Sequence, residues 1–204
     1  MASREHVVLE LGSGDGALTG ILRGLGLRVV ALDRRPPLPA GGPAVLGDAL
    51  VPPLRPGSCD LVVAANLVRH LAPRRRALDF LAAWAALLRP GAGLYLFEDA
   101  PRPAGGAAGN YGALQALLAR LAPESRGPLL AAQGCRRAAA KLALAATGGS
   151  WQNTWNLDTA AVLALLQAGR PRPGGEVAAL AESVATEGVA CGPAWWLRLA
   201  REDR

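Results

Sequence analysis

The chain has 204 residues, of which 51% are apolar, and its formal net charge is +6. This length and apolar content indicate one globular domain with a single core, and they exclude a disordered chain. No uncharged apolar run reaches about 18 residues, so we expect no membrane-spanning helix.

The first hundred residues alternate between β-prone runs, turns and helix-like segments. The apolar run Val7–Leu11 predicts a buried strand, and the glycines that follow it predict a tight loop that opens a helix over about Ala17–Leu25. A second helix is expected over Ala77–Leu88, and proline clusters predict loops before and after Ala44–Asp48. Four further strands are expected, at Arg28–Asp33, Ala44–Asp48, Asp60–Ala65 and Leu94–Phe97. This alternation predicts an open parallel α/β sheet.

The second hundred residues do not continue this alternation of strands and helices. A Pro/Gly/Ala loop at 101–110 precedes helix-like stretches at 111–122 and 129–146, and a polar-aromatic loop follows at 148–156. Asp158 then predicts the N-cap of a helix that ends before Gly169. The β-like runs 177–186 and 194–200 predict an antiparallel hairpin at the sheet edge. We expect one domain over residues 1–204, in which 100–156 is a helical insertion that forms a lid.

Polar residues follow the ends of several expected strands. The loop Gly12–Gly16 follows the first strand, Asp33 and Asp48 end the next two, and Asn66 follows the fourth. Ligands of open α/β sheets bind at the carboxyl ends of the strands, so these residues should share one rim. Asp33 lies 21 residues after Gly12, a spacing that lets an acid reach ribose hydroxyl groups. The pattern predicts a site for a small-molecule cofactor.

Five motifs occur in order over residues 5–99. They are Glu10-x-Gly12-x-Gly14-x-Gly16, Val30-Ala-Leu-Asp33, Gly47-Asp48-Ala49, Asp60-Leu-Val-Val-Ala-Ala-Asn66-Leu and Leu88-Arg-Pro-Gly-Ala-Gly93. Together they resemble the class I S-adenosylmethionine-dependent methyltransferase family. The resemblance implies an α/β, Rossmann-like fold with a mostly parallel seven-stranded sheet, an antiparallel C-terminal hairpin strand, helices on both faces and a helical insertion after the fifth strand.

The resemblance implies that the glycine loop binds the methionine half of S-adenosyl-L-methionine. Gly12, Ser13 and Gly14 would lie alongside the methionine half, and Gly16 belongs to the same loop. Glu10 would support the loop or bind the amino group of the cofactor. The carboxylates beside the loop would repel the pyrophosphate of a nicotinamide dinucleotide, which disfavours an oxidoreductase.

The remaining motif residues would bind the adenosine half and the reacting methyl group. By the same resemblance, Asp33 would bind the ribose hydroxyl groups, and Asp48 would face the adenine amino group beside the Ala49 backbone. Asn66 and Leu67 would lie near the sulfonium and the methyl group.

Two residues are candidates for catalysis. Methyl transfer requires mainly the alignment of acceptor atom, methyl group and sulfur, and a base is needed only where the acceptor must lose a proton. His70, beyond the fourth strand, and Asp99, at the end of the fifth, are the catalytic candidates, and Glu98 lies on the same rim. No metal site is expected.

The acceptor is the least defined part of the prediction. The segment Asn66-Leu-Val-Arg lacks the (Asn/Asp)-Pro-Pro-(Tyr/Phe) motif that enzymes of this family acting on base amino groups carry, and Cys59 precedes the fourth strand at its far end. Trp151 and Trp155 could line an acceptor pocket or fix the insertion to the core. We therefore predict a small-molecule acceptor.

Two alternatives remain open. The basic runs Arg74-Arg-Arg76 and Arg136-Arg137…Lys141 keep RNA as a possible acceptor, whose binding would weaken steeply with salt. A catalytically silent cofactor-binding protein would also retain an intact cofactor rim. The sequence does not define an oligomeric state.

The three cysteines lie far apart, without the spacing of a zinc site or a disulfide scaffold. Their odd number fits a reducing compartment, and the first strand begins too early to leave room for a signal peptide. We expect a cytoplasmic protein.

Overall fold

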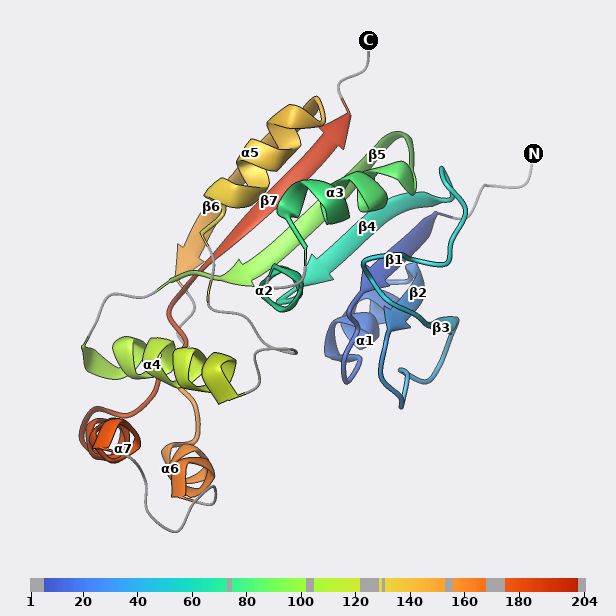
Figure 1. Ribbon diagram of the computed structural model, residues 1–204. Helices are drawn as coiled ribbons and strands as arrows, with labels where there is room; N and C mark the ends of the chain where they lie inside the picture. The colour runs from blue at the N-terminus through green and yellow to red at the C-terminus, as the bar shows by residue number, and fades with distance from the viewer. Residues whose placement is uncertain are drawn as a thin grey trace.

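The computed structural model describes residues 6–72, 75–101, 105–121, 129, 131–152, 156–167 and 175–201. They contain a seven-stranded sheet in the order β3-β2-β1-β4-β5-β7-β6 (Figure 1). The strands are β1 (Val7–Leu11), β2 (Arg28–Asp33), β3 (Ala44–Leu46), β4 (Cys59–Ala65), β5 (Leu88–Asp99), β6 (Leu144–Gln152) and β7 (Pro193–Arg201).

The sheet is parallel from β3 to β5 and antiparallel beyond it. β1 pairs with both β2 and β4, and β7 runs antiparallel between β5 and β6. The carboxyl ends of β1, β2, β3 and β4 therefore lie along one edge, where a ligand can reach the loops that follow them. The predicted Rossmann-like sheet with an antiparallel C-terminal strand is confirmed.

Helices pack on both faces of the sheet. On one face, α1 (Ala17–Gly24) covers a small apolar cluster around Val8, Val29 and Val63. The other face buries the main core, which includes Trp84 and Phe80. Three helices contribute to this core: α2 (Val68–Leu71), α3 (Ala77–Ala86) and α5 (Gln133–Lys141).

Three further helices form a group of their own beyond the end of β5 (Figure 1). They are α4 (Gly106–Leu121), α6 (Thr159–Gln167) and α7 (Gly175–Glu187). This three-helix group buries a separate apolar cluster, to which α4 contributes Leu114 and Leu117 and α7 contributes Leu180 and Val184. None of the helices in the described part of the chain is long and apolar enough to cross a bilayer.

The predicted C-terminal hairpin was partly wrong. The run 177–186 is not a strand but part of α7, and its buried Leu180 and Val184 follow the helical spacing of four residues. The partner of β7 is instead β6, which covers much of the predicted loop 148–156. Gly148 lets the two strands approach closely, because a Cβ there would lie 2.3 Å from the Trp196 carbonyl oxygen.

The predicted insertion 100–156 is divided between two regions. α4 belongs to the three-helix group, whereas α5 and β6 belong to the sheet layer. The helix α4 begins at Gly106, inside the loop expected at 101–110. The strand β5 begins at Leu88, earlier than the expected start at Leu94. Trp151 lies on β6, whereas Trp155 and Gly169 fall outside the described residues. The single-domain organisation stays a prediction.

Candidate functional site

A pocket of about 690 Å³ lies at the carboxyl ends of β1, β2 and β4. Nine of the ten predicted cofactor-binding residues line it, and the exception is Gly16. These nine are Glu10, Gly12, Ser13, Gly14, Asp33, Asp48, Ala49, Asn66 and Leu67. Sequence segments up to 57 residues apart therefore meet at one site, as the strand-end rule predicted.

The glycine loop turns tightly from β1 into α1. The backbone N–H groups of Gly12 and Ser13 both donate to the Leu32 carbonyl oxygen, at 2.8 and 3.0 Å. Gly12 has a φ of 71°, and Gly16, with a φ of 84°, is the N-cap of α1. Gly12 packs directly against the pocket wall, since a Cβ there would lie 2.7 Å from Leu67 Cδ1. Gly16 thus shapes the loop without lining the pocket.

A hydrogen bond between Glu10 of β1 and Thr19 of α1 joins the two elements on either side of this loop. Glu10 is buried and accepts a short hydrogen bond from the Thr19 hydroxyl group of α1. Burial raises the pKa of Glu10, while the Thr19 hydrogen bond and the charge of Arg23 oppose that shift. Glu10 therefore ties α1 to β1 and also faces the pocket.

Ser13 offers the pocket an unused hydroxyl group. Its side chain is buried, and Ser13 Oγ has no hydrogen-bond partner among the residues that the structure describes. Buried hydroxyl groups are almost always hydrogen-bonded, so such an atom in a pocket wall marks a contact for a polar ligand.

Two carboxylates, one at the end of β2 and one after β3, line the pocket. Asp33 Oδ2 accepts the N–H of Gly14 at 2.8 Å, and Asp33 Oδ1 accepts the N–H of Arg35 at 2.9 Å. An ionised carboxylate has about four acceptor positions, so Asp33 can still accept hydroxyl groups from a ligand. Asp48 Oδ1 accepts the N–H of Leu50 at 2.9 Å, which fixes the turn after β3.

The segment that follows β4 forms another part of the pocket wall. Asn66 has a φ of 51°, in the left-handed region, and its N–H donates to the Phe97 carbonyl oxygen at 2.7 Å. This turn places Asn66, Leu67 and, from α2, His70 along the pocket. The candidate base His70 therefore lies on the pocket wall.

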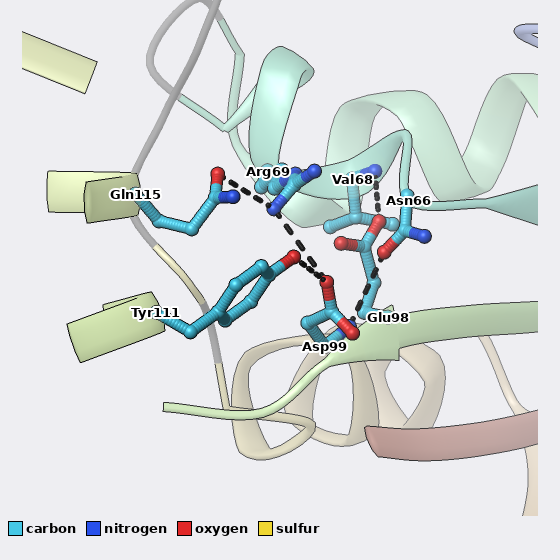
Figure 2. A network of polar contacts seen from close by, with 7 residues as sticks. All are labelled: Asn66, Val68, Arg69, Glu98, Asp99, Tyr111 and Gln115. Carbon is cyan, nitrogen blue, oxygen red and sulfur yellow. Dashed lines mark hydrogen bonds and ion pairs between the residues drawn. The ribbon is translucent and has the colours of Figure 1, made fainter. Parts of the chain in front are cut away.

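The other catalytic candidate, Asp99, is not among the pocket-lining residues. It is buried at the end of β5, where Asp99 Oδ2 accepts the Tyr111 hydroxyl group at 2.6 Å and lies 3.8 Å from Arg69 Nη1 (Figure 2). The structure thus separates the two candidates, and Asp99 joins the sheet to α2 and α4.

Sequence reasoning missed the buried partners of Asp99. Arg69, Tyr111 and Gln115 form hydrogen bonds or an ion pair within this cluster, and none of them lies in a recognisable motif. Arg69 precedes His70, but nothing in its local sequence distinguishes a buried arginine from an exposed one. Only the contacts between distant elements identify these residues.

None of the three cysteines, whose positions the structure describes, lines the pocket. Among the described residues, no group of His, Cys, Asp and Glu could hold a metal ion. Cys59 begins β4, at the end opposite the pocket, and Cys135 is buried in α5. Burial raises the pKa of Cys59, and burial with the nearby charge of Glu98 raises the pKa of Cys135 to about 12, so both thiols are weak nucleophiles.

The basic runs are partly engaged within the chain. Arg76 forms an ion pair with Asp79 at 3.1 Å, and Arg136 Nη1 donates to the Ala146 carbonyl oxygen at 3.4 Å. Arg74 falls outside the described residues. These contacts give a structural role to one arginine in each run.

Comparisons with known proteins bear on both sequence and fold. Residues 9–96 match the family model described as "Methyltransferase domain", which covers β1 to most of β5. A search of curated proteins finds no match.

Solved structures resemble the chain over nearly its whole length. The YcgJ protein from Bacillus subtilis is 14% identical with a TM-score of 0.63, and the match covers 98% of this chain and 93% of that one. A SAM-dependent methyltransferase from Archaeoglobus fulgidus is 12% identical with a TM-score of 0.62, covering 96% and 86%. Geranyl diphosphate C-methyltransferase from Streptomyces coelicolor is 14% identical with a TM-score of 0.54, covering 97% and 71%. At these identities the likeness is one of fold.

Proposed function

We propose that the chain is a class I S-adenosylmethionine-dependent methyltransferase that transfers a methyl group from S-adenosyl-L-methionine to a small-molecule acceptor. The match of residues 9–96 to a methyltransferase domain and the likeness in fold to a SAM-dependent methyltransferase support this proposal. The observation that carries this proposal is the pocket at the carboxyl ends of β1, β2 and β4, which nine of the ten predicted cofactor residues line. The catalytic role of His70, which lines the pocket, and the class of acceptor belong to the proposal as well, whereas Asp99 does not line the pocket and has no catalytic role in it.

The residues around the pocket fit the chemistry of this cofactor. It carries an ammonium group, a sulfonium and two ribose hydroxyl groups, which match carboxylates and carbonyl oxygens. Asp33 would accept the ribose hydroxyl groups, Asp48 would face the adenine amino group beside Ala49, and the unused Ser13 hydroxyl group would bind the methionine half. Gly12 and Gly14 leave the space that this half requires.

The protein's part in the reaction is mainly to position the reactants. The bound cofactor supplies an activated methyl group on a sulfonium. Asn66 and Leu67 would hold the acceptor side of the pocket, and such alignment can contribute about 7–11 kcal/mol to the lowering of a barrier. His70, on the same wall, would take the proton of an acceptor that must lose one.

The contacts of the basic runs favour a small molecule over RNA. The pocket combines polar side chains with apolar walls, which suits the cofactor whichever acceptor is used. Arg76 and Arg136, one in each basic run, already have partners within the chain.

The buried cysteines favour the reducing cytoplasm as the compartment of the protein.

The first test is calorimetric titration with S-adenosylmethionine, and in parallel with NAD and NADP. Micromolar binding of the methyl donor alone supports the proposal. Tight binding of NAD without binding of the methyl donor would overturn it, as would binding of neither to the folded protein.

A second experiment identifies the acceptor class. The protein is incubated with methyl-labelled donor and either a metabolite extract or total RNA. Label in a small molecule supports the proposal. Label in RNA, with binding that falls steeply as salt rises, would replace it by the RNA alternative. Donor binding without labelled product in either pool would favour the silent cofactor-binding alternative.

Asp33→Asn should weaken binding of the methyl donor about tenfold, because a hydrogen bond to a charged group contributes about 1.5–3 kcal/mol and the amide retains one acceptor oxygen. Calorimetry measures the change in Kd. The matched control is Asp158→Asn, since Asp158 caps α6 far from the pocket-lining segments and asparagine caps helices equally well. An unchanged Kd in Asp33→Asn would remove Asp33 from the cofactor site.

A further inference from the structure

A buried polar cluster joins the sheet, α2 and α4 (Figure 2). Five of its side chains are buried, and Asn66 lies at its edge on the pocket wall. The buried members are Arg69, Glu98, Asp99, Tyr111 and Gln115. None of them lines the pocket, so the proposed chemistry does not account for this concentration of buried charge.

Within the cluster, α4 makes two separate polar contacts. The Tyr111 hydroxyl group donates to Asp99 at the end of β5, at 2.6 Å. Gln115 Oε1, one helical turn further along α4, accepts a hydrogen bond from Arg69 Nη1 at 3.3 Å. Arg69 Nη1 also lies 3.8 Å from Asp99 Oδ2. The three-helix group is thereby linked both to the sheet and to α2.

The end of β5 holds α2 and the turn before it. Glu98 Oε1 accepts the N–H of Val68, the first residue of α2, and Asn66 Oδ1 accepts the N–H of Asp99 at 3.3 Å. A helix as short as α2 cannot maintain its own geometry in water, so its position depends on such contacts. His70, the neighbour of Arg69 on α2, therefore depends on them for its place at the pocket.

We propose that Arg69, Asp99 and Tyr111 are positioning residues that fix His70 and Asn66 on the acceptor side of the pocket, and that α4 sets this position. Charge-assisted hydrogen bonds among buried groups are strong and directional, which suits them to hold a short helix in one place. Only the assignment of this wall to the acceptor rests on the proposed function.

The hydrogen bonding of the cluster is incomplete. Among the described residues, Arg69 Nε and Glu98 Oε2 are buried without a hydrogen-bond partner. The charge of Arg69 also lowers the pKa of Glu98 against the larger effect of burial, so the two groups interact. The cluster thus holds two buried polar atoms without hydrogen-bond partners, and a shift of α4 can change which partners Arg69 uses.

The test uses the ring signals of His70 in NMR spectra. The chain has two histidines, so the His6→Gln variant assigns the signals of His70. Tyr111→Phe removes only the hydroxyl group that Asp99 accepts, and Gln115→Met removes the acceptor of Arg69. Neither residue belongs to the pocket wall. We expect both variants to shift the His70 ring signals in the protein without cofactor.

Arg120→Gln is the matched control on the same helix. It breaks the exposed ion pair with Glu176 at 2.6 Å, within the three-helix group, and should leave the His70 signals unchanged. Unshifted His70 signals in both Tyr111→Phe and Gln115→Met would overturn the proposal, as would an equal shift in Arg120→Gln. The measurement needs no cofactor, so a failure to bind the methyl donor would count against the proposed function and not against the positioning role.

Discussion

Gly12→Val should abolish detectable binding of the methyl donor, with a rise in Kd of at least about 100-fold. Gly12 has a φ of 71°, and a side chain there would press on Leu67, whose Cδ1 lies 2.7 Å from the Cβ position. Either the loop or Leu67 must then move into the space of the ligand. The left-handed conformation costs about 1–2 kcal/mol and overpacking about 1–3 kcal/mol, so we also expect the free energy of unfolding to fall by about 3 kcal/mol.

Gly20→Ala provides the control for this variant. Gly20 lies inside α1, only eight residues further along, and a Cβ there would meet no atom within 4 Å. Alanine should stabilise the helix by about 0.5–1 kcal/mol and leave the Kd unchanged. Calorimetry and chemical denaturation measure both quantities. Normal donor affinity in a folded Gly12→Val variant would show that the loop does not approach the ligand.

The pocket could be predicted because its determinants are local or periodic. The run Val7–Leu11, the glycines after it and the acid Asp33 each carry a signal within a few residues. Parallel pairing then brings the ends of β1, β2 and β4 together regardless of the loops between them. The positions of nine pocket-lining residues followed from that rule and from the family resemblance.

The structure of the residues after 100 was less predictable, because contacts between distant segments determine which elements form there. The strand β6 contains Gly148 and Gly149, which disfavour a strand locally, yet the close approach of Trp196 requires a residue without Cβ at 148. The run 177–186 contains β-branched residues, but its apolar positions follow the helical period. The link between Arg69 and Gln115 joins residues 46 apart and leaves no pattern in the sequence.

The buried Glu98 should make the stability of the protein depend on pH. Burial raises its pKa from 4.5 to about 7, against the opposing effects of Arg69 and of the Val68 N–H. Between these two values the native state retains a proton that the unfolded chain has lost. The free energy of unfolding should therefore fall as pH rises through this window, by about 3 kcal/mol in all, and level off above it.

Glu98→Gln isolates this contribution, because glutamine cannot titrate and its carbonyl oxygen can still accept the Val68 N–H. Chemical denaturation of both proteins at a series of pH values gives the difference in unfolding free energy, in which all other groups cancel. We expect the variant to gain stability relative to the native protein as pH rises to about 7. Glu182→Gln, on the exposed side of α7, controls for the loss of a surface charge. A constant difference between the native protein and Glu98→Gln would mean that Glu98 is ionised throughout, held by Arg69 as a buried ion pair.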